Sequence, residues 1–489
     1  MPYTASSLRG AEESQSVFEA RRRRWASLIV LCAALFLEAM NLSSINVQIP
    51  VIRQNLHLST ETAQFVVSAY LVTYAGFLLL GGRIADVFDR RLVFIGGVAL
   101  FGLASLAGGL ALDPTLLIVA RAIQGIGAAF TAPAALSIII ATFDQGPERN
   151  KALGIYSGMG ASGFAIGAVV SGVLTSAFSW RWGFFDYVII AAIVIVLTPM
   201  LVVKTNHPTS TTREVDLAGA LSSTAGLLIL VYTVGMANMV AVGQTLGGIA
   251  LAIILLVVFV VIEARMRAPM LPLGIFRSRT LTSANLVALT FLAAFTSLLF
   301  IATLYLQNVL GYSPFQAGLV FVPMGIVAAI VSNLGPLVLN RLGIKPTLVL
   351  GMLLLTLGIA LTALISTRGT FWNVLLPSLL IGMGLSLAFP PMTSAAVTGV
   401  QDADQGLASG LITTGQQLGG ALGLALVTAV NAASTPSVAG THPAAEAINQ
   451  ALVSGFRPAL LLAAVFALLG TLIALVGVKG HTRPDRVLM

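Results

Sequence analysis

Long apolar runs alternate with short polar segments along almost the whole 489-residue chain. A helix that crosses a bilayer needs about 20 mainly apolar residues. Fourteen runs meet this requirement, and they begin near Trp25, Thr62, Leu92, Leu116, Ala152, Phe184, Asp216, Gln244, Leu281, Phe315, Thr347, Phe371, Leu407 and Phe456. The pattern therefore predicts an all-α membrane protein with fourteen transmembrane helices.

The composition excludes a cytoplasmic globular protein. Hydrophobic residues make up 57% of the chain and charged residues only 9%, whereas soluble domains carry about 25% charged residues. The single cysteine, Cys32, rules out an intramolecular disulfide and a cysteine-based metal site. The four histidines are scattered without ligand spacing. We therefore expect no metal and no cofactor, and a cleavable signal peptide is not expected because the first apolar run is too long.

The net charge of +8 could suggest nucleic acid, but the basic residues fall in short clusters between the apolar runs. With the N-terminus inside, 21 of the 26 Lys and Arg residues lie in inner segments. Only Arg53, Arg181, Arg368 and Arg457 lie in outer segments. This asymmetry predicts cytoplasmic N- and C-termini and insertion in the plasma (inner) membrane.

Three polar segments stand apart from the apolar runs. The N-terminal arm, residues 1–24, is polar and is expected to be mobile. A basic, proline-containing linker, Glu263 to Thr280, is expected to lie along the inner membrane surface, and a hydrophilic outer segment is expected from Asn431 to Gly455.

The two ends of the chain echo each other at an offset of about 250 residues. GGRIADVFDRR after the second run matches LGPLVLNRLGIKP after the tenth, and the Gly-rich fifth run matches the thirteenth. We expect a cytoplasmic arm (1–24), a six-helix half (25–203), two inserted helices with a linker (204–280), and a second six-helix half with a short tail (281–489). Parallel repeats of this kind place a substrate site near the midplane, between the halves.

Two charges fall inside apolar runs. Glu38 lies in the first, close to Asn41 and Asn46, and Arg121 lies in the fourth. From the helix rise, Glu38 lies about 20 Å and Arg121 about 22 Å above the inner edge of the membrane core. Charges at this depth need a partner or water. The depths predict a Glu38–Arg121 pair, direct or through water, and a purely structural ion pair is the alternative.

The chain resembles the major facilitator superfamily in GGRIADVFDRR, in RAIQGIGAA of the fourth run and in the Gly-rich fifth run. The fourteen runs, SWRWGFF and YLQNVLGYSPFQAG make it similar to the fourteen-helix drug:proton antiporters. The resemblance implies the major-facilitator fold and a proton-handling role for Arg121, followed by Gln124 in the motif. It also implies a conformational-gating loop, whose residues are Gly82, Arg83, Asp86, Arg90 and Arg91. The alternative is a turn whose arginines only set the orientation.

The chain also departs from the family pattern. The family acid of the first helix corresponds to Asn41, and Glu38 lies one turn earlier on the same face. Either the proton carrier has moved by a turn, or Glu38 has another task, such as binding a cationic substrate. The motif's second loop glycine is Asp89, and its helix-5 proline is Ala168. The helix-5 glycines predict close helix packing, which could be generic, at positions Gly160, Gly163, Gly167 and Gly172.

Further polar side chains complete the candidate site. Asp186 near the start of the sixth run is a second proton-coupling candidate, or else the partner of Arg181 at the outer rim. Amides and a tyrosine within the runs either line a substrate cavity or join helices. The predicted cavity residues are Asn41, Asn46, Gln64, Tyr70, Gln124, Asn285, Gln416 and Gln417.

The favoured function is secondary active transport: proton-coupled efflux of amphipathic or hydrophobic, cationic or zwitterionic, small molecules by alternating access. A transporter of lipid or another endogenous hydrophobic product is the first alternative. A non-transporting membrane receptor or assembly protein is the alternative from another class. No enzyme motif is present. The expected partners are a small-molecule substrate, protons and membrane lipid, without nucleic acid, and the expected state is a monomer.

Overall fold

The computed structural model describes residues 4–143, 147–202, 216–237, 240–266, 269, 271, 273–397, 405–436 and 444–478. No strand occurs in these ranges. The helices of the first half are α1 (Thr4–Leu56), α2 (Thr60–Val87), α3 (Arg90–Gly109), α4 (Pro114–Thr142), α5 (Pro147–Ala177) and α6 (Trp182–Leu201). Two further helices follow, α7 (Leu217–Gly235) and α8 (Val242–Arg265).

The second half begins after a short 3₁₀ turn, η1 (Leu273–Arg277). Its elements are α9 (Arg279–Leu304), the π-helical turn η2 (Tyr305–Val309), α10 (Pro314–Leu342), α11 (Ile344–Thr362), α12 (Trp372–Val397), α13 (Gln405–Ser434) and α14 (Ala445–Gly477). Fourteen of the described helices are long and apolar enough to cross a membrane. The predicted all-α fold with fourteen spans is thus confirmed.

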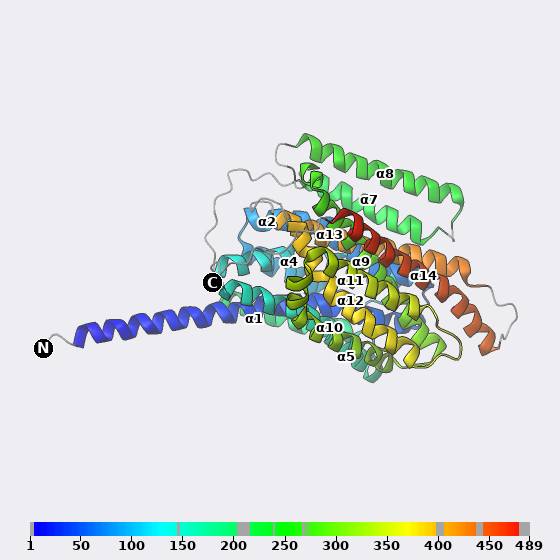
Figure 1. Ribbon diagram of the computed structural model, residues 1–489, viewed down its shortest axis with the longest axis horizontal. Coiled ribbons are helices and arrows are strands. Elements are labelled where there is room, and N and C mark those ends of the chain that lie inside the picture. The colour runs from blue at the N-terminus through cyan, green and yellow to red at the C-terminus, as the bar shows by residue number, and fades with distance from the viewer. Residues whose placement is uncertain are drawn as a thin grey trace.

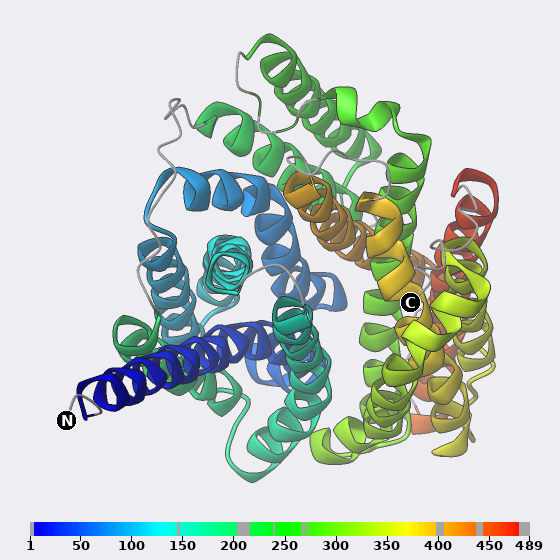
Figure 2. The same cartoon turned by 60° about the vertical axis from the view of Figure 1, so that its left-hand side comes forward.

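Packing in the first half is repeated helix by helix in the second. Helix α1 contacts α5 and α6, α2 contacts α4, and α3 contacts α4 and α6. In the same way α9 contacts α13 and α14, α10 contacts α12, and α11 contacts α12 and α14. Figure 2 shows the two groups side by side, seen nearly along their helices. The fold is therefore two parallel six-helix halves.

The most extensive contacts between the halves are those of α2 with α13 and of α5 with α10, and α1 also contacts α9 and α10. The inserted helices lie along one edge of the bundle (Figure 1): α7 contacts α2 and α13, and α8 contacts α7. Only 6% of the apolar window of α8 is buried, so most of its surface is left for lipid. We call the bundle face beside Arg21–Arg24 the inner face and the opposite one the outer face.

Polar side chains at the helix starts define several boundaries. Ser59, Asp89, Asp113, Asp216, Ser278 and Ser313 each accept a hydrogen bond from a backbone N–H in the first helical turn. This capping satisfies donors that have no partner inside the helix. Asp89, which replaces a motif glycine, is the N-cap of α3 and accepts from the Arg91 N–H at 2.9 Å.

Two polar segments are more helical than the sequence indicates. The N-terminal arm is helical from Thr4 onward and continuous with α1 (Figure 1), because extending an existing helix avoids the cost of a new nucleus. Its mobility stays a prediction. The outer segment expected up to Gly455 is helical from Ala445, and α14 continues through Pro458. Residues 1–3, most of the 204–216 connection and the tail from 479 lie outside the described residues.

Candidate functional site

Glu38 and Arg121 belong to a group of buried polar side chains on three neighbouring helices of the first half. Helix α1 carries Glu38 and Asn41, whose spacing of three residues places them on one face. Helix α2 carries Tyr70 and Tyr74, and helix α4 carries Arg121 and Gln124. These side chains form a polar network inside an otherwise apolar bundle.

Arg121 is the centre of this network and is fully buried. Its Nε donates to the Val66 carbonyl oxygen at 2.8 Å. One terminal nitrogen donates to Asn41 Oδ1 at 2.5 Å and to Gln124 Oε1 at 2.9 Å. The guanidinium also lies 4.8 Å from the centroid of the Tyr70 ring, an arrangement favourable for a cation. Arg121 is therefore held in place by neutral oxygens and an aromatic ring.

Gln124 extends the network to α3. Its Nε2 donates to Ser105 Oγ at 2.7 Å, and Ser105 Oγ donates to the Phe101 carbonyl oxygen at 2.7 Å. Both side chains are fully buried. The resulting chain of hydrogen bonds fixes the amide that receives the Arg121 guanidinium.

The predicted Glu38–Arg121 pair is not direct. The side chains that form hydrogen bonds with Arg121 are Asn41 and Gln124. The one that forms a hydrogen bond with Glu38 is Tyr74. A pair through water stays a prediction. The three residues between Glu38 and Asn41 correspond to about 4.5 Å along the helix. The comparison of depths could not resolve a difference of this size. The α1 residue that meets Arg121 is Asn41, at the position where the family has its acid.

Glu38 lies one turn closer to the inner face and is 4% exposed. The Tyr74 hydroxyl donates to Glu38 Oε2 at 3.3 Å, while Oε1 is buried without a hydrogen-bond partner. The Tyr74 and Tyr70 rings meet edge to face at 5.7 Å. Two tyrosines thus lie between the carboxylate and the arginine, and the carboxylate has no cationic partner in the part of the chain that the structure describes.

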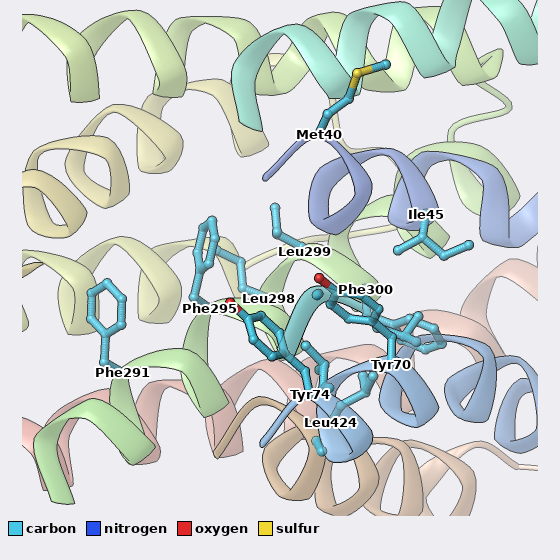
Figure 3. Close-up of a cluster of buried hydrophobic side chains, with 14 of the residues drawn as sticks. Met40, Ile45, Tyr70, Tyr74, Phe291, Phe295, Leu298, Leu299, Phe300 and Leu424 are labelled. Atoms are coloured by element: carbon cyan, nitrogen blue, oxygen red, sulfur yellow. The ribbon is translucent and has the colours of Figure 1, made fainter. Parts of the chain in front are cut away.

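Apolar and aromatic side chains from both halves surround these tyrosines. Figure 3 shows Tyr70 and Tyr74 of α2 with residues of α1, α9 and α13 in one buried cluster. Its labelled apolar members are Met40, Ile45, Phe291, Phe295, Leu298, Leu299, Phe300 and Leu424. Phe295 also contacts Phe164 of α5 at 5.4 Å. Glu38 and its tyrosine therefore border the boundary between the halves.

The other predicted cavity residues are not brought together. Asn46 donates to the Leu42 carbonyl of its own helix at 2.9 Å. Gln64 donates to Ser68 at 2.9 Å and faces Gly235 of α7, away from the Arg121 network. Asn285 of α9 lies against Gly415 of α13, and the neighbouring Gln416 and Gln417 are buried. The amides thus fall into separate groups on the two halves.

The glycines of α5 lie at close helix crossings. A Cβ on Gly163 would lie 2.6 Å from the Phe36 carbonyl oxygen, and one on Gly167 would lie 2.7 Å from the Met40 backbone of α1. A Cβ on Gly172 would lie 2.9 Å from Phe315 Cα of α10. Gly160 is less tightly packed, with its first neighbour at 3.5 Å. The glycines therefore serve two interfaces, one within the first half and one between the halves.

Two arginines of the predicted gating loop bind backbone carbonyls of neighbouring helices, and one of these carbonyls is at a helix end. Arg90 donates to the Ser137 carbonyl of α4 at 3.5 Å, and Arg91 donates to the Val202 carbonyl at the end of α6 at 3.3 Å. Carbonyl groups at helix C-termini attract cations. Neither arginine forms an ion pair within the described part of the chain. Gly82 faces Pro133, Arg83 lies in the last turns of α2, and the Asp86 side chain lies outside the described residues.

Asp186 does not pair with Arg181, so the rim ion pair considered from the sequence is wrong. Arg181 instead donates to the Ala111 carbonyl at 3.0 Å and lies over the Trp180 ring at 4.5 Å. Both Asp186 carboxylate oxygens are buried, and no side chain donates a hydrogen bond to them in the described ranges. Asp186 is thus an acid with buried carboxylate oxygens in a half-buried residue, separate from Arg121.

The sequence did not predict two features of this region, the role of Tyr74 and an apolar groove. Tyr74 was not placed in the site, although its spacing of four from Tyr70 puts both on one helix face. A groove of about 340 Å³ between α2, α4 and α7 was not foreseen either; its lining includes Phe65, Val72, Ile118 and Tyr232. The groove is apolar and lies apart from Glu38.

The repeated halves, the fourteen spans and the buried charges near the half boundary define a polytopic membrane transporter. A model of the Major Facilitator Superfamily matches residues 31–424, and the chain belongs to this family. Its members are transporters of small-molecule substrates and not enzymes.

Similar proteins cover nearly the same length. A puromycin resistance protein of Streptomyces alboniger is 35% identical over 94% of this chain and 92% of its own. A cephamycin export protein of Amycolatopsis lactamdurans is 36% identical over 88% and 89%. Among solved structures, an auto-inhibited peptide transporter of the POT family has a TM-score of 0.71 at 15% identity, and the match covers 96% of this chain and 99% of that one. This last likeness shows the fold alone.

Proposed function

We propose that the protein exports amphipathic, cationic or zwitterionic small molecules in exchange for protons. Membership in the transporter family supports the transport part of the proposal. The antibiotic part is supported by relatives at 35% and 36% identity, which are described by puromycin resistance and cephamycin export. No cofactor is needed, because the proton gradient supplies the free energy. We further propose that both termini are cytoplasmic, as the charge asymmetry favours.

The buried, unpaired carboxylate of Glu38 is the observation that carries the proton-coupling proposal. An ionised carboxylate without a cationic partner is costly in an apolar bundle, and binding a proton removes that cost. The carboxylate accepts a hydrogen bond from Tyr74, which belongs to the cluster shared by the two halves (Figure 3), where alternating access changes the packing most. Asp186, whose carboxylate oxygens are also buried, is the second candidate acid.

Tyr74 connects the protonation state of Glu38 to the cluster between the halves. An ionised carboxylate accepts the Tyr74 hydrogen bond, whereas a protonated one carries a donor of its own. Gain or loss of the proton therefore alters the contacts of the Tyr74 ring, which belongs to the cluster of α1, α2, α9 and α13. A proton that binds one conformation more tightly then shifts the population toward it. Arg121, held by neutral groups, would act as a fixed positive charge.

The surroundings of Glu38 favour an amphipathic cargo. The aromatic and aliphatic side chains of the cluster suit the apolar body of an amphipathic molecule. An endogenous lipid or other hydrophobic product is the second candidate, favoured by the apolar groove between α2, α4 and α7. A receptor without transport is less consistent with the two buried charges.

Purified protein in liposomes with an imposed pH gradient tests the proposal. We expect cargo-dependent proton flux in the natural protein, and loss of that flux with retained cargo binding in Glu38→Gln. Glu446→Gln, at an exposed acid of α14, is the matched control and should behave as the natural protein does. Unchanged coupling in Glu38→Gln would refute the role of Glu38. Lipid relocation without drug flux would favour the second candidate, and neither activity would favour a receptor.

A further inference from the structure

The outer end of α9 carries an uncommon turn. Residues Tyr305–Val309 form the π-helical turn η2, closed by the Leu310 N–H bound to the Tyr305 carbonyl at 3.2 Å. Such turns are rare and often mark functional sites. The turn contains Gln307 within YLQNVLGYSP, a motif to which the transport mechanism above gives no task.

Gln307 reaches across to the other half. Its Nε2 donates to the Val47 carbonyl oxygen of α1 at 2.9 Å, over a separation of 260 residues. This oxygen belongs to a helix backbone, so the bond ties the position of the whole helix α1 and not only that of a rotatable side chain.

The turn itself is anchored within the second half. Tyr305 is fully buried, and its hydroxyl donates to the Ser366 carbonyl at 2.8 Å, in the connection between α11 and α12. The Tyr312 N–H also binds the Leu306 carbonyl at 3.0 Å. One side of η2 is thus held by its own half, and Gln307 extends from the other side to α1.

A second contact between the halves lies at the same outer face. The Phe315 N–H of α10 donates to Ser176 Oγ of α5 at 3.2 Å. On the inner part of α5, by contrast, a Cβ on Gly154 or Gly158 would meet nothing within 4 Å. The halves are therefore joined at the outer face in this conformation.

We propose that Gln307 is a positioning residue that latches the outer ends of α1 and α9 together in the outward-closed state. The bond joins two bodies that separate when the outer face opens, so opening must break it. Val47 lies nine residues from Glu38 on the same helix, about 14 Å, so movement of the proton-binding helix and release of the latch are linked. The inference rests on alternating access in the proposed function, but not on Glu38 as the proton carrier.

Spin labels on the outer face test the latch. Cys32, the single cysteine, is replaced by alanine, and labels are placed at the exposed positions Leu112 and Leu364, one in each half. Distance distributions are measured in liposomes without cargo or pH gradient. Gln307→Leu removes the donor, and Asn308→Leu changes a neighbouring amide of the same turn that has no hydrogen bond to α1 in the structure.

We expect the ratio of outer-open to outer-closed protein to rise roughly 2- to 10-fold in Gln307→Leu, the effect of losing one hydrogen bond, and to stay unchanged in Asn308→Leu. Gln307→Asn, which keeps the amide but is one methylene shorter, should behave like Gln307→Leu, and it replaces that variant if the leucine prevents folding. Unchanged distances in both Gln307 variants would overturn the proposal. Because this readout is independent of proton flux, failure of the latch and failure of proton coupling remain distinguishable.

Discussion

Arg121 donates a hydrogen bond to Asn41 where a carboxylate would be the expected partner of a buried arginine. The acid of α1, Glu38, lies one turn away and is bound by Tyr74 instead. The positive charge and the acid are therefore separated by two tyrosine rings. Arg121 of α4 thus lies beside Asn41 of α1, whereas the acid lies one turn away on α1.

The separation of Glu38 from Arg121 predicts that an acid at position 41 can take over part of the task of Glu38. In Asn41→Asp the new carboxylate would meet Arg121 directly, in the geometry that Asn41 now has. We expect Glu38→Gln to lose cargo-dependent proton uptake, and the double variant Glu38→Gln with Asn41→Asp to recover part of it. Proton uptake into liposomes is measured with a pH-sensitive dye. A double variant as inactive as Glu38→Gln, although folded, would show that position 41 cannot hold the exchangeable proton.

Arg121 should also be important for stability. Replacement by leucine leaves the buried oxygens of Asn41 and Gln124 without their donor, at a cost of about 1–3 kcal/mol for each group. Arg121→Lys keeps the charge but cannot reproduce the planar fork of donors, so we expect an intermediate loss. Melting temperatures in detergent provide the comparison. Equal melting temperatures for the natural protein and Arg121→Leu would contradict this account.

The α5 glycines at the α1 crossing predict a pair of opposite effects. A methyl group at Gly163 would collide with the Phe36 carbonyl, whereas one at Gly158 would meet nothing within 4 Å. Gly163→Ala should destabilise the protein by about 1–3 kcal/mol. Gly158→Ala should be neutral or stabilising by up to about 1 kcal/mol, because alanine favours the helix. Melting temperatures of both variants test this prediction. A Gly163→Ala variant more stable than Gly158→Ala would be inconsistent with this packing.

Gly172 predicts a change of conformation and not only of stability. A valine there would push against the Phe315 backbone of α10 and would separate the outer ends of the halves. With spin labels at the exposed positions Leu112 and Leu364 in protein lacking Cys32, the outer-open fraction should rise severalfold. Gly154→Val, on the same helix but in open space, should leave that fraction unchanged. The same fraction in both variants would mean that this crossing does not control the outer face.

Asp186 can be separated from Glu38 by its position. It lies in the first turn of α6, outside the network of Arg121 and the two tyrosines. We expect Asp186→Asn to keep most of the cargo-dependent proton uptake that Glu38→Gln loses. The number of protons per cargo molecule, from parallel proton and cargo flux, measures any contribution. A loss as large as that of Glu38→Gln would make Asp186 an equal partner.

The sequence predicted the architecture well because lipid imposes a length and a polarity on every span. The site was harder. Depth along a helix placed Glu38 and Arg121 at one level, but it could not resolve a difference of one turn, and so Asn41 was overlooked as the arginine's partner. The place of Tyr74 in the site could have been predicted from its spacing to Tyr70. The bond from Gln307 to Val47 could not have been predicted, because it depends on how two distant segments meet.

The membrane-spanning part of α1, from Arg21 to Leu56, connects the outer face, the buried acid and the inner face. Its outer part is held by Gln307, its middle holds the acid, and its inner end carries the exposed Arg21 opposite Glu148. The crossing with Gly163 and Gly167 of α5 lies between these ends and can act as a fulcrum. If α1 tilts about this crossing, its inner end moves when its outer end moves. A probe on the exposed Arg22, on the opposite side of the membrane, should therefore report opening at the outer face.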